Sequence, residues 1–180
     1  NASFLVNHIG KSVFAKKISI YEKPHLLRAL GSAPFDDEGV RTSDRVLVEE
    51  GVLRGYLLNS YSARKLGLQT TGNAGGFHNI LLETSQFNLN DLIKQMDQGL
   101  LVTEVMGQGI NLVTGDYSRG AAGFWIENGE ILYPVEEITI AGNLKDMYQN
   151  IIAVGNDINN KSSIQTGSIF LEKMMIAGTE

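Results

Sequence analysis

Short runs of hydrophobic residues alternate with polar positions along most of the chain, a pattern typical of β-strands. The clearest case covers residues 123–133, where Asn128 and Gly129 separate two apolar runs. Both residues tolerate a positive φ, so the dipeptide predicts the turn of a β-hairpin. Pro134 follows at once and cannot donate a backbone hydrogen bond, which predicts a strand end or a sheet edge there.

A second hairpin is predicted over residues 45–58, with Glu49, Glu50 and Gly51 as its turn. Apolar runs of strand length recur elsewhere in the chain. They predict further strands at 18–21 (closed by Pro24), 79–83, 100–105, 137–140, 152–154 and 168–174.

Helical spacing is clearest over residues 89–98, where Asn88 can cap the first turn and Gly99 ends the pattern. Two more helices are predicted at 60–66, capped by Asn59 or Ser60 and stopped by Gly67, and from Asn143 onward, with Leu144, Met147, Tyr148 and Ile151 on one face. A short helix is also compatible with residues 4–9, and the polar stretch 31–44 predicts a loop.

Strands follow one another through short turns more often than through helices, which favours antiparallel pairing. The predicted fold class is α+β: mostly antiparallel β-sheet with hairpins and about three short helices packed on it. No repeat or linker divides the chain, so residues 1–180 are expected to form a single domain. The chain begins with Asn1 and not with Met, and we expect it to be a piece of a longer protein.

Composition narrows the functional classes. The net charge is −5 and no run of Lys or Arg occurs, so nucleic acid is an unlikely partner in comparison with a protein or peptide. The chain has no cysteine, which excludes an internal disulfide and any thiolate metal site. No apolar stretch approaches the length of a membrane span and no basic signal-peptide start is present, so a membrane partner is not expected and the cytoplasm is the expected location.

The three histidines do not form a metal-binding pattern. His8, His25 and His78 are far apart in sequence, so no pair shares a helical turn, and His-Glu-x-x-His is absent. His78 follows Gly75 and Gly76 in a predicted loop, where it either reaches a cleft or is an ordinary hydrogen-bonded side chain. The adjacent carboxylates at 36–38 are typical of a solvated turn.

A glycine-rich stretch over residues 106–120 is the most distinctive segment. It lacks the third glycine of a dinucleotide fingerprint, because Leu112 stands there, and it lacks the Gly-Lys-Ser/Thr of a P-loop. Ser118 is a weak candidate nucleophile, since Asp116 replaces the first glycine of Gly-x-Ser-x-Gly. Two interpretations remain: a tightly turned strand lead-in braced by Asp116 and Arg119, or an exposed backbone groove to which a peptide adds as a strand.

Several of these segments together resemble the PmbA/TldD family, in particular its PmbA branch, also called TldE. The resemblance covers about residues 21–178, and it implies that the chain is the C-terminal domain of a longer protein. The motifs that carry it are 60–68 (SYSARKLGL), 71–76 (TGNAGG), 106–109 (MGQG), 114–125 (TGDYSRGAAGFW), 137–147 (EITIAGNLKDM) and 154–158 (VGNDI).

This resemblance implies a function that the residues alone do not reveal. Family members are cytoplasmic bacterial metallopeptidases, once named modulators of DNA gyrase. A TldD-type and a PmbA-type subunit form a heterodimer that cleaves leader peptides and unfolded polypeptides. The TldD-type subunit carries the zinc ligands: a His-Glu-x-x-x-His motif in its N-terminal part and a cysteine near its C-terminus. The PmbA-type subunit lacks the histidine motif.

The chain differs from the catalytic branch at the position of the cysteine zinc ligand. Thr166 stands where that branch has its cysteine, and a hydroxyl is a poor zinc ligand. We therefore expect no catalytic or metal-binding residue in this chain, with zinc only in the TldD-like partner. The leading hypothesis is a non-catalytic subunit that helps to form the substrate chamber and pairs with that partner, or with itself in isolation. Candidate groove residues are Gly75, Gly76, His78, Gly107, Gly109, Asp116, Tyr117, Ser118 and Arg119.

Two alternatives stay open. One is a self-sufficient serine hydrolase that uses Ser118. The other is a non-catalytic binding or regulatory module, in line with the older gyrase name, although the acidic net charge argues against direct DNA contact.

Overall fold

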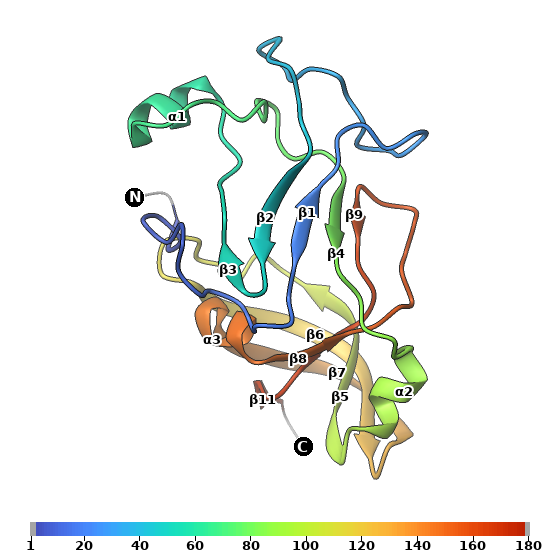
Figure 1. Cartoon of the computed structure of the whole chain (residues 1–180). Helices are drawn as coiled ribbons and strands as arrows, with labels where there is room; N and C mark the ends of the chain where they lie inside the picture. The colour runs from blue at the N-terminus through green and yellow to red at the C-terminus, as the bar shows by residue number, and fades with distance from the viewer. Residues whose placement is uncertain (1–2, 179–180) are drawn as a thin grey trace.

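The computed structural model describes residues 3–178 and has the predicted α+β class, with three short helices and mostly antiparallel strands (Figure 1). The strands are β1 (Ile20–Glu22), β2 (Arg45–Glu49), β3 (Val52–Leu53), β4 (Ile80–Leu82), β5 (Gln98–Met106), β6 (Asp116–Glu127), β7 (Glu130–Asn143), β8 (Ile151–Val154), β9 (Ile164–Gln165), β10 (Ile169–Leu171) and β11 (Met175–Ala177). The helices are α1 (Ser60–Leu66), α2 (Leu89–Lys94) and α3 (Leu144–Gln149).

These strands form three sheets. The first has the order β3-β2-β1-β4-β9, the second pairs β10 with β8, and the third has the order β11-β7-β6-β5. All pairings are antiparallel except that of β4 with β9. The long β6–β7 ribbon passes beside the shorter strands and extends beyond them (Figure 1).

The predicted Asn-Gly turn joins β6 to β7, with φ of 52° at Asn128 and 76° at Gly129. The hairpin is longer than the predicted 123–133, because it pairs residues from Asp116 to Asn143 and absorbs the predicted strand 137–140. Of the two predictions for Pro134, the strand end was wrong, because this residue lies inside β7, and the sheet edge is confirmed. Pro134 is tolerated because, within residues 3–178, this part of β7 pairs only with β6 and its other edge is open.

The first hairpin is confirmed in its turn but not in its length. Glu50 and Gly51 take φ of 46° and 79° between β2 and β3. The return strand stops at Leu53 and does not reach residue 58, because the following backbone finds other partners. The Leu58 N–H, for example, donates to the hydroxyl of Thr71.

All three helices begin where predicted, but Gly99 does not end α2, whose C-cap is Gln95. Asn59 caps α1 and Gly67 ends it with φ 68°, while Asn88 and Asp91 form a reciprocal capping box at α2. Helix α2 ends at Lys94 and not at residue 98, because Gln98 already pairs with Glu127 at the start of β5.

Three further expectations were wrong, and two short strands were missed. Residues 4–9 form turns, with Asn7 at φ 64°, in place of a helix. Ile151 belongs to β8 and not to the face of α3. The predicted strand 168–174 is shorter, and β9 and β11 were missed because two or three residues carry no periodicity.

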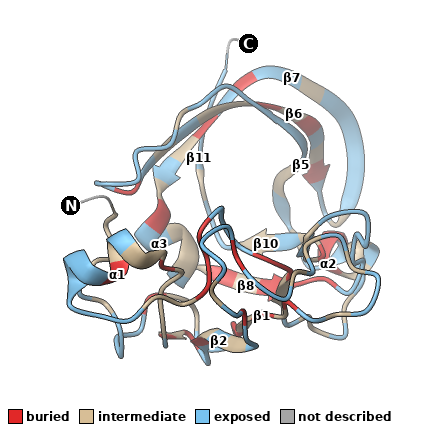
Figure 2. Ribbon diagram, turned by 90° about the horizontal axis from the view of Figure 1, so that it is seen from above, coloured by how far each residue is buried: buried red, intermediate tan, exposed pale blue. Residues whose placement is uncertain are grey.

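The buried core lies mainly between the shorter strands, whereas β5, β6 and β7 arch away from them and are largely exposed (Figure 2). Two small clusters form around Val48 and Ile18, and a third around Ala121, Ile138 and Ile140 on the long sheet. No helix in residues 3–178 has the length and apolar character needed to cross a membrane.

Candidate functional site

The glycine-rich stretch forms a loop of residues 107–115 between β5 and β6, and this loop folds back along the start of β6. Ser118 donates its backbone N–H to Gly109 O at 2.7 Å, and Asn111 donates to Asp116 O at 2.8 Å. A Cβ placed on Gly109 would lie 1.4 Å from Ser118 O, so only glycine fits this approach. The predicted strand lead-in is therefore present and tightly packed.

Asp116 braces this loop. Its carboxylate accepts a hydrogen bond from Thr114 Oγ1 at 2.6 Å and one from Asn143 Nδ2 at 3.1 Å. These two side-chain hydrogen bonds lower the pKa of Asp116 below its ordinary value, and the bond from Thr114 has the larger effect. An ionised carboxylate thus ties β6 to the end of β7.

Arg119 braces the same region from the other side. Its guanidinium donates to Met106 O at 3.4 Å and to Val105 O at 3.3 Å, both at the end of β5. The two charged residues of the motif therefore contact this chain's own loop and strand. Tyr117 is half-buried and pairs with Ile110 across the loop.

Ser118 has no catalytic surroundings in the described residues. Within residues 3–178, each histidine makes its ring hydrogen bonds elsewhere: His8 with Val6 O, His25 with Thr42 and His78 with Glu22. None of these imidazoles contacts the Ser118 hydroxyl, so the serine-hydrolase alternative has no geometric support here.

Gly75, Gly76 and His78 lie with β1 and β4, not with the 107–120 stretch. Gly75 and Gly76 take φ of 91° and 128°, and a Cβ on Gly75 would fall 2.3 Å from a carboxylate oxygen of Asp37. His78 is only 8% exposed. The nine candidate groove residues therefore fall into two separate groups.

His78 belongs to a buried charged network that the sequence did not reveal. Glu22 Oε1 accepts from the His78 N–H at 2.9 Å, from His78 Nδ1 at 3.1 Å and from Asn73 Nδ2 at 2.7 Å. Arg45 Nε lies 3.2 Å from Glu22 Oε2, so the two side chains form an ion pair. The Nε–H of Arg45 does not point at the carboxylate well enough to form a hydrogen bond. Because a carboxylate only accepts, Nδ1 of His78 carries a proton.

A second buried carboxylate holds the neighbouring loop. Asp36 accepts backbone hydrogen bonds from Glu38 and Val40 at 2.9 Å each and from Ala74 at 2.9 Å. Burial raises the pKa of Asp36, but these three hydrogen bonds outweigh it and the net shift is downward. The predicted solvated turn at 36–38 is thus only partly solvated, because Asp36 is buried.

Thr166 lies in the loop between β9 and β10. Its hydroxyl donates to Gly167 O at 3.0 Å, and the next residues are held by Asp157, which accepts from Ser168 N and Oγ at 3.0 and 2.7 Å. Burial raises the pKa of Asp157, but the hydrogen bonds from Ser168 bring it below its ordinary value. Gly167 packs against Gly155 O too closely for any Cβ.

Comparison with known proteins identifies this arrangement. The family model of the PmbA/TldA metallopeptidase C-terminal domain matches residues 1–178. The chain belongs to this family. The "Metalloprotease PmbA homolog" of Haemophilus influenzae is 61% identical over 98% of this chain and 40% of its own length.

The PmbA branch is the nearer of the two. Buchnera aphidicola of Acyrthosiphon pisum has a PmbA homolog that is 48% identical to this chain and a TldD homolog that is 26% identical, each over 98% of the chain. The chain covers 40% and 42% of these relatives, so it spans about two fifths of their length.

Solved PmbA/TldD-family structures have the same fold. A Bacteroides thetaiotaomicron protein, named as a proposed modulator of DNA gyrase, matches with a TM-score of 0.93 at 35% identity over 99% of this chain and 40% of its own. TldE from Thermococcus kodakarensis matches with a TM-score of 0.83 at 28% identity over 98% of this chain and 43% of its own.

The metallopeptidase family implies a zinc ion, and the residues present do not fit one. Thr166 offers a hydroxyl already bonded to Gly167 O. Within residues 3–178, no three His, Cys, Asp or Glu side chains gather as metal ligands would. No step of peptide hydrolysis is therefore assigned to a metal held by this domain.

Proposed function

We propose that this chain is the C-terminal domain of a PmbA-type subunit that pairs with a TldD-type subunit in a zinc peptidase of the cytoplasm. The pair cleaves leader peptides and unfolded polypeptides. The TldD-type subunit holds the zinc ion, and this domain contributes a wall of the substrate chamber.

The observation that carries the pairing is the apolar surface of the long sheet. Large hydrophobic side chains on β5, β6, β7 and β11 are between 36% and 72% exposed. Neighbours such as Ile131 and Leu132 point to opposite faces of β7, so both faces of the long sheet expose apolar side chains, and large exposed apolar areas often mark contact surfaces. The exposed hydrophobic side chains are Val102, Val105, Met106, Phe124, Ile131, Leu132, Tyr133, Met175 and Ile176.

Relatives of both types support the choice of partner. Buchnera has a PmbA homolog and a TldD homolog, and the domain described here aligns with both. Two related domains that share a fold can associate through equivalent surfaces, as subunits of two-fold dimers do. A TldD-type chain is thus the partner that this surface fits best, and a homodimer is the form we expect without it.

The same sheet suits an extended substrate. β5 is nine residues long and is the edge strand of its sheet, so its outer backbone groups have no strand partner among the described residues. An unpaired edge accepts an extended polypeptide as an added strand. The braced 107–115 loop lies at the end of this edge and would limit how far such a chain extends.

The test is a peptidase assay of the full-length protein, of the TldD-type subunit and of their mixture, with an unstructured polypeptide as substrate. We expect cleavage by the mixture, loss of cleavage with a chelator, and none from the PmbA-type subunit alone.

Leu132→Asp should weaken co-purification with the TldD-type subunit. Thr139→Asp, which adds the same charge at an exposed β7 position where the side chain is already polar, is the matched control. Metal-dependent cleavage by the lone PmbA-type subunit contradicts the proposal.

A further inference from the structure

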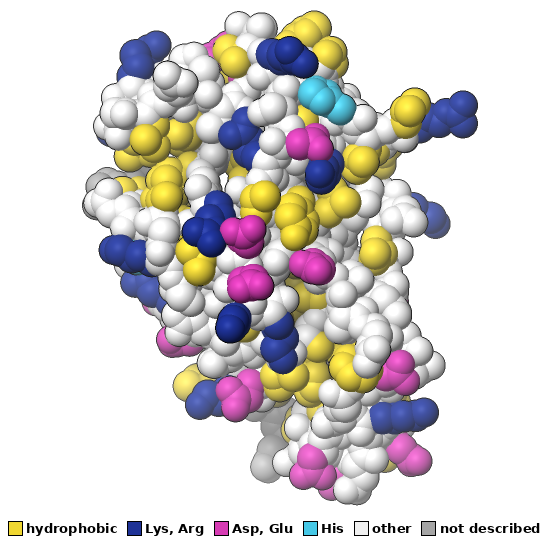
Figure 3. All heavy atoms as spheres, in the orientation of Figure 1, with side chains coloured by type: hydrophobic (Ala, Val, Ile, Leu, Met, Phe, Trp, Pro, Cys, Tyr) yellow, Lys and Arg dark blue, Asp and Glu magenta, His cyan; other side chains and the backbone are white. Residues whose placement is uncertain are grey.

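A hollow of about 510 Å³ opens on the surface away from the long sheet, and residues with polar or charged side chains line it. It is lined by His25, Arg41, Thr42, Ser43 and Asp44. In Figure 3, a histidine at the upper end of the face shown has both basic and acidic side chains near it.

His25 is held in one orientation by a buried threonine. Thr42 is 1% exposed, and its hydroxyl donates to Ala33 O at 2.6 Å. His25 Nε2 lies 2.9 Å from the same hydroxyl oxygen. Since the hydroxyl proton is already used, Nε2 must carry the hydrogen and donate it. Nδ1 makes no hydrogen bond to any residue in the range 3–178.

The backbone of Arg41 is held in place, while its guanidinium has no ion-pair partner among the described residues. Its main chain bridges to Phe35, and Gly72 packs so closely that an added Cβ would lie 2.8 Å from Arg41 O. Within the described part of the chain, the Arg41 guanidinium has neither a carboxylate partner nor a hydrogen bond. A guanidinium presents paired donors that match the two oxygens of a carboxylate.

The other two wall residues agree with an anionic ligand. Ser43 Oγ accepts from Arg45 Nη2 at 3.2 Å, which leaves the Ser43 hydroxyl proton for a ligand. Asp44 would repel an anion, but Lys23 Nζ lies 2.9 Å from its Oδ2 and neutralises it. With Asp44 paired to Lys23, the uncompensated charge at the wall is the positive charge of Arg41.

We propose that this hollow binds a carboxylate group of a polypeptide, with Arg41 as the paired donor and Ser43 as a third donor. The carboxylate belongs either to a free C-terminus or to an acidic side chain. The identity of the ligand as a polypeptide rests on the proposed function. The binding of a carboxylate does not, because it depends only on these side chains.

The test is a titration of the isotope-labelled full-length protein, followed by the amide NMR signals of residues 41–44 and the ring signals of His25. The probes are sodium acetate, acetyl-trialanine with a free C-terminus, its C-terminal amide, and acetyl-Ala-Glu-Ala-amide, all at constant ionic strength set with chloride. We expect saturable shifts with acetate and none with the neutral amide. The two remaining peptides show whether a C-terminus or an acidic side chain binds more tightly.

Variants decide whether the hollow is responsible. Arg41→Gln should weaken carboxylate binding by about tenfold, the usual effect of losing a paired charged donor. Arg64→Gln, an exposed position on α1, removes the same charge elsewhere and should bind as the parent does. Ser43→Ala should weaken binding by about threefold and keeps the test decisive if Arg41→Gln does not fold. Shifts that never saturate, or equal affinity in parent, Arg41→Gln and Ser43→Ala, overturn the proposal. Peptidase activity enters none of these measurements, so a failed peptidase assay leaves their result intact.

Discussion

Asn143 Nδ2 donates to Asp116 Oδ1 at 3.1 Å, which joins the last residue of β7 to the first residue of β6. The same Asn143 caps α3 by accepting from Lys145 N at 3.1 Å. One side chain therefore ties the glycine-rich loop to a helix. The Leu144 N–H completes this link by donating to Gly115 O at 2.7 Å.

Asp116→Ala should loosen this junction without unfolding the domain. We expect the amide of Leu144 to exchange with deuterium about tenfold faster, because its acceptor at Gly115 is no longer braced. The pKa of Asp116 is lower in the folded chain than in the unfolded one, so the carboxylate stabilises the loop above the unfolded pKa. That contribution is lost as pH falls through the folded pKa. Hydrogen exchange of Leu144 measures both effects, and Thr139→Ala, with unchanged exchange, is the control.

Asp36 should contribute to acid sensitivity in the same direction. The pKa of Asp36 is lower in the folded chain than its ordinary value of 3.8. The Asp36 carboxylate therefore stabilises the fold fully above this ordinary value, and the stabilisation is lost as pH falls through the lower, folded pKa. Asp36→Ala removes three backbone hydrogen bonds to a carboxylate and should cost about 3 kcal/mol of unfolding free energy near neutral pH. Urea unfolding at a series of pH values checks this. A variant that loses stability with acid as steeply as the parent does speaks against the assignment.

Gly109→Ala tests the close approach of the loop to β6. The added methyl would meet Ser118 O at 1.4 Å, so backbone must move and the cost should be at least about 3 kcal/mol. Gly55→Ala is the matched control, since no atom lies within 4 Å of its added Cβ and its φ is not positive. Thermal unfolding of both variants compares them. Equal melting temperatures mean that the loop is not packed as described.

Glu22→Gln tests the buried network around His78. Glu22 is 1% exposed and contacts Arg45, His78 and Asn73. Removing its charge leaves Arg45 without its ion pair, which should cost about 3 kcal/mol. Glu49→Gln breaks an ion pair of 2.9 Å with Arg54 that is half exposed, and it should cost about 0.5 kcal/mol. Denaturant midpoints of the two variants should differ clearly, and similar midpoints contradict a structural role for the network.

Local signals in the sequence predicted the fold well wherever a short motif decides the geometry. Asn128-Gly129, Asn88 with Asp91, and Gly67 each specify a turn or cap through their own backbone preferences. Lengths were harder, because partners distant in sequence set them. The helical pattern runs on to residue 98, yet Gln98 pairs with Glu127 and the helix ends early.

The candidate site shows the same division. The glycines at 107 and 109 were found because their pattern is local, and Asp116 and Arg119 brace the loop as one of the two interpretations proposed. The Glu22–His78 contact joins residues 56 positions apart and has no local signature. The carboxylate hollow was also missed, since His25 and Arg41 are brought together only by the fold of the loop between β1 and β2. The sequence gives no local signal for this pair, because the same loop also contains Lys23, Arg28 and four acidic residues.

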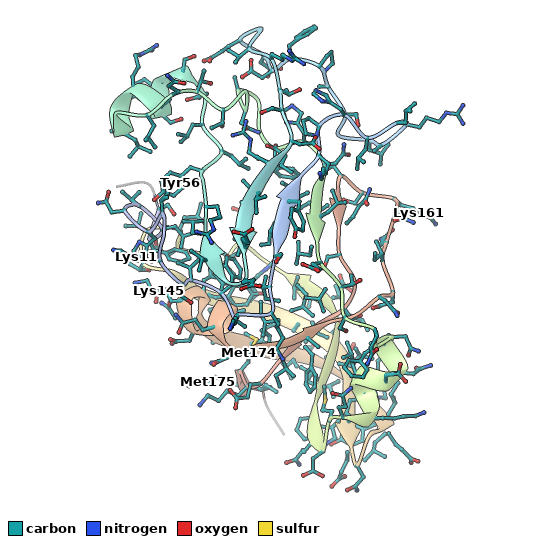
Figure 4. All side chains as sticks on the ribbon, in the orientation of Figure 1. Lys11, Tyr56, Lys145, Lys161, Met174 and Met175 are labelled. Atoms are coloured by element: carbon teal, nitrogen blue, oxygen red, sulfur yellow. The ribbon has the colours of Figure 1, made fainter. Side chains whose placement is uncertain are left out.

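Side chains on the C-terminal strands lie near the surface that pairing would cover: Figure 4 labels Met174 and Met175 beside the long sheet, and Met175 is 72% exposed. The account predicts that this surface is covered by a subunit that brings its own metal.

Zinc analysis of the separated subunits tests that prediction most directly. The full-length protein and a TldD-type subunit are co-expressed, purified as a complex, separated under mild denaturing conditions that preserve tight zinc, and analysed by native mass spectrometry. The account predicts one zinc ion on the TldD-type chain and none on the PmbA-type chain. Zinc retained by the PmbA-type chain alone, and lost on substitution of residues within it, would contradict the account.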